Sequence, residues 1–384
     1  MAAPLQGISV LDVGTLTPGK YCTFLLADMG ARVLRIERPP SVPGSITDED
    51  LVLNRNKRSI TLNLRDDAGK AVLNRLAKDA DVLLEGYRPS TARRIGLTYE
   101  ILKSLNPGLV YCSLSGFGQS GPYSERAAFD LIFLGLSGAL RALVGSGGPL
   151  IVPGLYLADM VSGLMATIGI VSALVPQQKT GEGRYLDLAM LDSVFSILAV
   201  SQGVRRSSEG EEGDAGGAAS FGNSPCYDVY ETCDDAHIVL GIGREASWKR
   251  LCETLDRPDL VEHQWAGEPK RTEVARFLEE TFKTARADEW VERLEKLDIE
   301  ICRLNSPREA FADRQIVARE MVTDTDHPLA GQVHLVSSPF NYGTDKVGSD
   351  TRPAPTVGQD TEEILRELDY GEAAIQRMKE NGAI

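Results

Sequence analysis

The sequence predicts an α/β protein whose first two hundred residues form a doubly wound, mostly parallel sheet. Between residue 7 and about residue 198, short β-rich runs alternate with helical stretches, which is the pattern of βαβ units. The chain has 384 residues, of which 42% are hydrophobic and 25% charged, as in globular proteins. A chain of this length buries a sizeable core without disulfides or a structural metal.

Six short runs are expected to be the strands of this sheet. They are residues 8–13, 32–37, 59–64, 82–85, 109–113 and 185–188. Helices are expected between them, at residues 21–29, 68–77 and 99–104. The last of these precedes Asn106-Pro107, a pair that is typical of a helix end.

The longest apolar stretch covers residues 154–175 and is followed by Pro176. Its length suits a membrane span, but Asp159, Ser162 and three glycines favour a buried core helix. Asp159 is either an anchor for the start of this helix or a functional group. A carboxylate removed from water is a stronger nucleophile and base, so the second interpretation has a chemical motive.

A polar, glycine-rich stretch begins near residue 205 and predicts a linker over residues 205–224. The next third of the chain is expected to be a small α+β domain, with a hairpin about Asp234-Asp235 followed by helices to about residue 297. Farther on, residues 327–339 are expected to be extended and residues 361–381 helical.

Charge and cysteine usage exclude several classes of function. The 41 Lys and Arg against 55 Asp and Glu give a net charge of −14, which disfavours nucleic acid and anionic membranes as partners. The six cysteines form no CxxC pair and have no histidine at metal-ligand spacing, which indicates reduced thiols and no metal site. The N-terminus lacks the features of a secretory signal, so a cytoplasmic protein is expected.

Two glycine patterns could indicate a nucleotide loop. Residues 116–121 match GxGxxG, yet Pro122 and a polar segment follow where the phosphate-binding helix should begin. Gly241-Ile-Gly243 lies between a strand and a helix, but that strand belongs to a hairpin. Both patterns are more typical of turns.

Three basic clusters lie at or near strand ends, and together they would suit a multiply phosphorylated ligand. The alternative is that each forms surface ion pairs. The four histidines are dispersed and indicate no Ser-His-Asp triad. The clusters comprise Arg35 and Arg38; Arg55, Lys57 and Arg58; and Arg88, Arg93 and Arg94.

Eight segments, in order along nearly the whole chain, resemble the family III CoA-transferases, a family that also contains the α-methylacyl-CoA racemases. They are residues 5–13, 26–39, 54–60, 85–89, 94–97, 115–122, 180–184 and 357–365. Each segment is weak evidence alone, whereas the ordered set is specific. The resemblance also accounts for the glycines at residues 116–121 as a turn of the family.

The resemblance implies a large Rossmann-like domain built from both chain ends, residues 1–204 with 325–384, and a small α+β domain over residues 225–324. It also implies two chains interlocked as rings in a homodimer. Asp159 would be the transferase nucleophile or one of the racemase bases. The implied CoA contacts are Arg38, Lys57, Arg58, Tyr87, Arg88 and Arg94.

One departure separates the two chemistries. Racemases of the family carry Gly-His-Asp where this chain has Ala128-Phe129-Asp130, so Phe129 replaces the second base. Transferases commonly have an aromatic residue at this position, followed by an acidic or amide one such as Asp130. In the small domain, Glu245 lies near the racemase's partner carboxylate, and the N–H groups of Gly241 and Gly243 are candidates for stabilising an oxyanion.

The expected function is therefore transfer of CoA between an acyl-CoA and a carboxylic acid, through an anhydride and a thioester on Asp159, with no prosthetic group. Transfer between the two carboxyl groups of one dicarboxylic acyl-CoA is a special case. The alternative enzyme is an acyl-CoA racemase or epimerase with a different second base, and a third class is a CoA-binding protein without catalysis.

Overall fold

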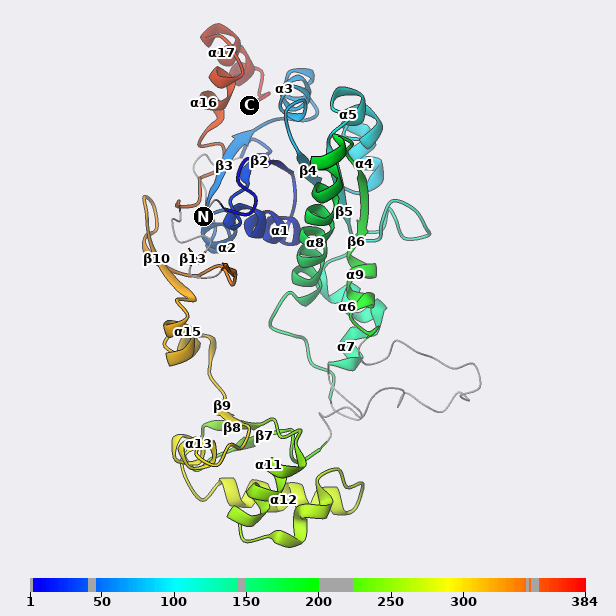
Figure 1. The fold of residues 1–384 in the computed structure, drawn as a ribbon. Helices are drawn as coiled ribbons and strands as arrows, with labels where there is room; N and C mark the ends of the chain where they lie inside the picture. Colours follow the sequence, from blue (N-terminus) through cyan, green and yellow to red (C-terminus); the bar gives the residue numbers. More distant parts are fainter. Residues whose placement is uncertain (1–2, 41–45, 144–148, 200–223, 343–344, 347–351) are drawn as a thin grey trace. The chain divides into compact units, whose positions relative to one another are not determined.

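The computed structural model describes residues 3–40, 46–143, 149–199, 224–342, 345–346 and 352–384 (Figure 1). The predicted linker at residues 205–224 lies outside these, except for Ser224. The chain divides into two compact units, the first from residues 1–140, 151–198 and 315–384 and the second from residues 141–150 and 199–314. The domain boundaries and the dimer implied by the resemblance stay predictions.

A six-stranded parallel sheet is the centre of the first unit, as the alternating pattern predicted. Its strands run in the order β3-β2-β1-β4-β5-β6, and every neighbouring pair is parallel. The strands are β1 (Ser9–Val13), β2 (Arg32–Glu37), β3 (Lys57–Thr61), β4 (Val82–Glu85), β5 (Val110–Ser115) and β6 (Tyr185–Ala189).

The boundaries predicted for β3, residues 59–64, are wrong. This strand begins at Lys57 and ends at Thr61. The chain then leaves the sheet, and the N–H of Asn63 donates to the carbonyl of Ala383 near the C-terminus. That partner is 320 residues away in sequence, so no local pattern could indicate where the strand ends.

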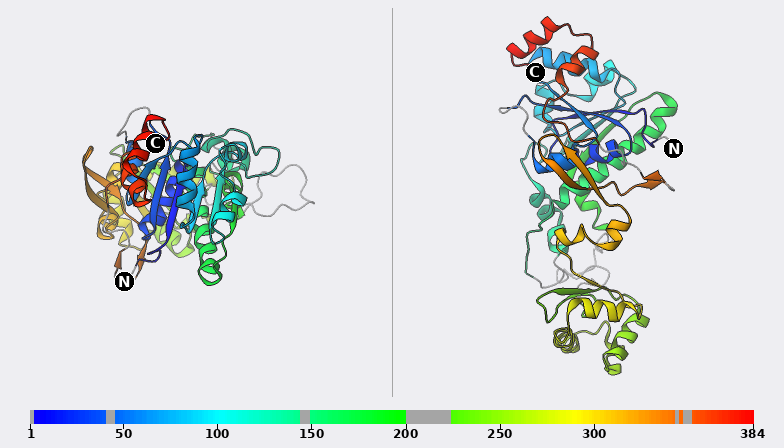
Figure 2. Two further views of the ribbon diagram at one scale, coloured as in Figure 1. Left: turned by 90° about the horizontal axis from the view of Figure 1, so that it is seen from above. Right: turned by 90° about the vertical axis from the view of Figure 1, so that its left-hand side faces the viewer.

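Helices cover both faces of the sheet (Figure 2). Helices α1, α6, α8 and α9 share one apolar core with one face, and α3, α5, α16 and α17 share another core with the opposite face. The helices are α1 (Thr17–Asp28), α2 (Asp48–Leu53), α3 (Asp67–Ala77), α4 (Pro89–Arg94), α5 (Tyr99–Leu105), α6 (Asp130–Ser137), α7 (Ala139–Ala142), α8 (Leu157–Thr180), α9 (Met190–Ser196), α15 (Arg314–Ala318), α16 (Thr361–Glu367) and α17 (Glu372–Glu380).

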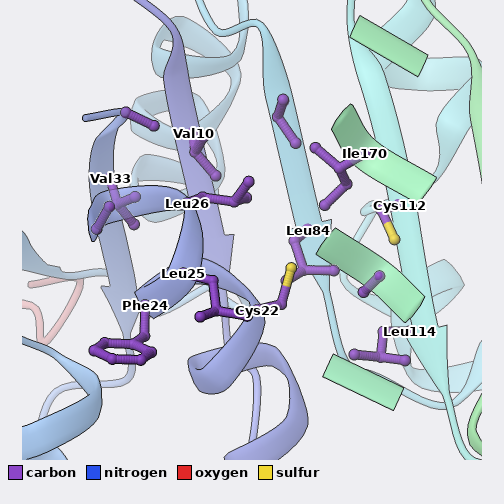
Figure 3. Close-up of a cluster of buried hydrophobic side chains, with 14 of the residues drawn as sticks. Val10, Cys22, Phe24, Leu25, Leu26, Val33, Leu84, Cys112, Leu114 and Ile170 are labelled. Carbon is purple, nitrogen blue, oxygen red and sulfur yellow. The ribbon is translucent and has the colours of Figure 1, made fainter. Parts of the chain in front are cut away.

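The first core lies between the sheet and the pair of helices α1 and α8 (Figure 3). Val10, Leu84 and Leu114 come from three strands and pack with Leu25 of α1 and Ile170 of α8. Successive strand residues face opposite sides, so Leu11 and Val13 belong to the second core. Asp12 therefore points to the same face as Val10, into the layer that contains α1.

Helix α8 is the long apolar helix that the sequence predicted. By length and composition it could cross a membrane, which for one helix is weak evidence, and its stripe of small residues packs on α1. A Cβ on Gly163 would lie 2.6 Å from the carbonyl oxygen of Pro18, so the two helices touch there. The predicted end at Pro176 is wrong. Pro176 falls in the last turns, and the helix ends at Gly181, whose φ of +72° suits glycine.

The C-terminal part of the chain returns to the sheet of the first unit. The backbone N–H of Ser59 donates to the Asp360 carboxylate (2.7 Å), and the N–H of Asp360 donates back to the Ser59 carbonyl (2.9 Å). The segment before α16 thus covers the edge strand β3. Two small hairpins precede it, formed by β10 (Val322–His327) with β11 (Gly331–Val336) and by β12 (Asn341–Tyr342) with β13 (Asp345–Lys346).

The second unit contains a three-stranded antiparallel sheet and its own apolar core. The predicted hairpin about Asp234-Asp235 is confirmed, and Asp235 takes a φ of +56° in its turn. The third strand, β9, was not predicted because it is only three residues long. The elements are β7 (Val229–Glu231), β8 (His237–Leu240), α11 (Glu245–Thr254), η2 (Pro258–His263), α12 (Lys270–Phe282), α13 (Ala287–Glu295), β9 (Ile301–Arg303) and α14 (Pro307–Ala310).

Candidate active site

The carboxyl edge of the parallel sheet is where a ligand site is expected, because the strand order reverses between β1 and β4. The segments that leave the strands at this edge carry several of the predicted site residues. Arg38 follows β2 directly and is exposed, and Tyr87 and Arg88 follow β4. Tyr87 is partly buried, whereas Arg88 and Arg94 are exposed at the two ends of α4.

Asp159 is the third residue of α8 and is partly buried. Burial, together with the nearby carboxylates of Asp130 and Glu49, raises the pKa of Asp159 to about 7. No described Lys or Arg forms an ion pair with it. A carboxylate whose charge is so poorly compensated is more basic and more nucleophilic than an exposed aspartate.

Asp130 controls the environment of Asp159. It opens α6, and its Oδ1 accepts hydrogen bonds from the backbone N–H of Ala158 (2.7 Å) and from the N–H of Asp159 itself (3.1 Å). These N–H groups are unpaired donors at the positive end of α8, which would otherwise stabilise a negative charge on Asp159. Asp130 occupies them and adds a second negative charge, so both effects raise the pKa of Asp159.

The close packing of α1 and α8 fixes where Asp159 lies. Gly163, one turn after Asp159, touches the carbonyl of Pro18 in the first turn of α1. Helix α1 in turn begins just after β1, and Thr17 and Lys20 in its first turns hold the Glu49 carboxylate at 3.0 and 2.9 Å. Asp159 is therefore anchored beside the connection that leaves the carboxyl end of β1.

A buried polar network holds that connection in place. The Arg35 guanidinium donates to the Asp12 carboxylate (2.9 Å) and to the carbonyl oxygen of Thr15 (3.0 Å). Thr15 also donates its hydroxyl to Asp12, as does Thr23 of α1. Burial alone would raise the pKa of Asp12, but the Arg35 and Lys57 charges outweigh it and hold the pKa below its usual value.

Lys57 and Arg58 do not lie as the resemblance implied for CoA contacts. The Lys57 ammonium is buried, 2.8 Å from the Thr23 hydroxyl and 3.7 Å from the Asp12 carboxylate, and burial lowers the pKa of Lys57 to about 7. Arg58 pairs with Glu367 (2.9 Å) and Glu363 (3.2 Å). Both residues open β3, so their backbone lies at the edge opposite Arg38, and this arrangement counts against direct phosphate contacts.

Phe129 and Asp130 lie at the start of α6, and the structure brings Asp130 to Asp159. Phe129 precedes the first turn with its side chain 78% exposed, and it offers no titratable group. Among the described residues, no group of three His, Cys, Asp or Glu side chains could hold a metal ion.

The predicted residues of the second unit are less consistent with their assigned roles. The N–H of Gly241 donates to the carbonyl of Glu300 (3.0 Å), so it is not free to stabilise an oxyanion, and that prediction is wrong. Gly243 and Glu245 are exposed at the start of α11. Their contacts with an acyl group stay predictions.

Sequence reasoning missed the supporting residues Glu49, Asp12 and Arg35. Asp12 offered a signal, because a carboxylate within the apolar run Val-Leu-Asp-Val must find partners when it is buried. Glu49 offered none, since its neighbour Asp159 is 110 residues away and in another helix.

Comparison with known proteins identifies the family. Residues 5–361 match CoA-transferase family III. The human succinyl-CoA:glutarate CoA-transferase is 29% identical, over 99% of this chain and 90% of its own length. The formyl-CoA:oxalate CoA-transferase of Escherichia coli O157:H7 is 30% identical over the whole of both chains. A crystal structure of a CaiB/BaiF family protein from Brucella suis superimposes with a TM-score of 0.82 and 28% identity, over 96% of this chain and all of that one. The chain belongs to CoA-transferase family III and is an enzyme that transfers CoA.

Proposed function

We propose that this enzyme moves CoA from an acyl-CoA to a free carboxylic acid with Asp159 as the nucleophile. The observation that carries the proposal is the partly buried Asp159 carboxylate, whose pKa is raised to about 7 and whose helix N-terminus is occupied by Asp130. Such a carboxylate is ionised at neutral pH in a substantial fraction of molecules, yet it is more nucleophilic than an ordinary aspartate.

Four steps complete one turnover without net gain or loss of protons. The Asp159 carboxylate attacks the thioester carbonyl, the C–S bond breaks, and a mixed anhydride and the CoA thiolate result. The thiolate attacks the Asp159 carbonyl and releases the donor acid as its carboxylate, which leaves an aspartyl-CoA thioester. The acceptor carboxylate attacks this thioester and expels CoA thiolate, and the thiolate then attacks the acceptor acyl carbon and regenerates Asp159.

Small carboxylic acids are the substrates we propose. Relatives that align over nearly their full length are named for succinyl-CoA with glutarate and for formyl-CoA with oxalate. Coenzyme A would bind at the carboxyl edge of the sheet, where Arg38, Tyr87, Arg88 and Arg94 offer cations and a phenol. Transfer within one dicarboxylic acyl-CoA is a variant of the same chemistry.

Racemisation is the second candidate, and Phe129 argues against it. A racemase needs a proton acceptor on each face of the α-carbon, and the exposed phenyl ring beside Asp130 cannot be one. We therefore favour transfer over epimerisation.

A homodimer is the assembly that we propose. Large apolar side chains are exposed along neighbouring helices of the first unit, as expected for a surface that a second chain covers. They are Leu131, Ile132 and Leu136 of α6, Leu164, Ile168 and Val175 of α8, and Phe195 of α9. All six cysteines are free, which suits the reducing cytoplasm, the location that we propose.

Mass spectrometry of acyl-CoAs tests the proposed reaction. The enzyme is incubated in D2O with a panel of acyl-CoAs and free mono- and dicarboxylic acids. New acyl-CoA masses that match the added acids are expected, and their absence together with deuterium at the α-carbon would favour racemisation. Asp159→Ala should abolish transfer. Asp192→Ala is the matched control, because Asp192 is the third residue of α9 and is exposed.

A further inference from the structure

A second carboxylate with a perturbed environment, Glu85, has no part in the proposed chemistry. It is the last residue of β4, level with Val13 of β1 and Ser113 of β5, and only 1% of it is exposed. An ionisable group at such a depth is costly to bury unless it makes compensating hydrogen bonds. Its position at the carboxyl edge, beside the point where the strand order reverses, relates it to the ligand site.

The Glu85 carboxylate holds the turn that follows it. Its Oε2 accepts the backbone N–H of Tyr87 at 2.7 Å, so residues 85–87 form a closed turn at the end of the strand. The tyrosine ring packs directly on Gly14, where an added Cβ would lie 2.0 Å from the phenol oxygen. The turn is therefore fixed on one side by the β1 connection and on the other by Glu85.

Arg88 takes its position from the same turn. It is the residue that precedes α4, and its guanidinium donates to the carbonyl oxygen of Glu125 (3.2 Å). If the Tyr87 N–H lost its acceptor, this buried donor would be unpaired, and the turn would have to move to satisfy it. The side chains of Tyr87 and Arg88 would then shift together.

We propose that Glu85 is a positioning residue for acyl-CoA, which sets the turn that presents Tyr87 and Arg88 to the ligand and tightens it when the carboxylate is ionised. The inference rests on the proposed function, because it takes Tyr87 and Arg88 as CoA contacts. An ionised acceptor makes a stronger hydrogen bond than a neutral one, so the affinity for CoA follows the ionisation of Glu85.

The groups around Glu85 set the pH at which this occurs. Burial raises the pKa of Glu85 to about 7, against hydrogen bonds from Ser113, Tyr87 and Tyr111 and with a further rise from the Asp187 charge on β6. Cys112 of β5 and Tyr185 of β6 also face this region, and both stay neutral near pH 7 because burial raises the pKa of each. Ionisation of Glu85 is therefore half complete close to neutral pH.

Three variants test the proposal. Glu85→Leu removes the acceptor for Tyr87 and should raise the KM for acyl-CoA and the Kd for free CoA about tenfold, with kcat changed less than threefold. Glu85→Gln keeps an oxygen that can accept the N–H and should restore most of the affinity. Asp81→Leu is the matched control. Asp81 also accepts a backbone N–H, that of Ser9 (2.8 Å), but at the opposite edge of the same sheet, so its loss should leave KM unchanged.

The pH dependence gives a readout that a purely structural role would not change. Calorimetry with free CoA should show the affinity of the wild-type enzyme falling from pH 8 to pH 6 more steeply than that of Glu85→Gln, which cannot lose a charge. Parallel profiles, or a folded Glu85→Leu with the KM of Asp81→Leu, would overturn the proposal. If Glu85→Leu does not fold, the comparison with Glu85→Gln decides alone. A wild-type enzyme that transfers no CoA would instead overturn the proposed function.

Discussion

Asp12 and Asp159 lie in the same unit, and helix α1 contacts the elements that carry them, yet the two carboxylates differ in nearly every property that matters for chemistry. Asp12 is completely buried, but Arg35 and Lys57 surround it and its pKa is lowered. Asp159 is only partly buried, its nearest charged groups are Asp130 and Glu49, and its pKa is raised to about 7.

The comparison teaches that the sign of the neighbouring charges, rather than the depth of burial, separates the structural carboxylate from the reactive one. Asp12 is ionised and fully paired, so it fixes the connection between β1 and α1. Asp159 is unpaired, so its lone pairs are available to a substrate. Each variant below changes one side of this contrast.

The largest effect is expected from Asp159→Ala. Loss of the nucleophile should lower kcat at least a thousandfold, because no other group in the site replaces the covalent step. The fold should be retained, since no cation loses its partner. Steady-state kinetics with circular dichroism checks both parts, and an active Asp159→Ala enzyme would make Asp159 structural like Asp12.

Asp12→Asn should have the opposite profile. It leaves the buried charges of Arg35 and Lys57 without their counterion, which should lower the free energy of unfolding by about 3 kcal/mol. Urea denaturation measures this loss. Unchanged stability, with activity lost instead, would show that Asp12 and not the pairing is important to the reaction.

Asp130→Asn sharpens the contrast by removing one of the charges that face Asp159. The α8 N–H groups also become less strongly engaged, so both changes should lower the pKa of Asp159. The acidic limb of the kcat profile should move to lower pH by about 1, and kcat on the plateau should fall about tenfold because the nucleophile is weaker. A profile identical to that of the wild type would contradict the role given to Asp130.

The smallest effect is on stability and concerns the sign of linkage. A carboxyl whose folded pKa is raised disfavours the folded state once pH exceeds the unfolded pKa, and the penalty is complete above the folded pKa of about 7. Asp159→Asn should therefore stabilise the protein at pH 8 and leave its stability unchanged near pH 3. Thermal unfolding at the two pH values tests this, and a destabilised variant at pH 8 would mean that Asp159 has a cationic partner.

Much of the fold could be predicted from sequence because alternation of strands and helices is a local property. Five of the six strands of the parallel sheet lie within two residues of their predicted ends. The end of β3 could not be predicted, because a partner 320 residues later decides it. The apolar surroundings of Asp159 in the sequence pointed to that residue as a candidate.

The rest of the site depends on contacts between distant segments. Asp130 and Glu49 reach Asp159 only through the packing of α6, α1 and α8, so no spacing in the sequence could indicate them. Lys57 was taken as a phosphate ligand for its charge, whereas its burial beside Asp12 makes it part of the network under the β1 connection. Similarly, the hydrogen bond that uses the Gly241 N–H comes from β9, a strand too short to predict.

The most direct test of the central claim is to find the covalent intermediate. The enzyme is mixed with acyl-CoA without an acceptor acid, quenched in acid and digested, and the peptides are analysed by mass spectrometry. We predict a peptide carrying CoA in thioester linkage at Asp159, absent from Asp159→Asn and present in Asp192→Ala. A CoA adduct on any other residue, or turnover by an enzyme that never carries one, would contradict the account.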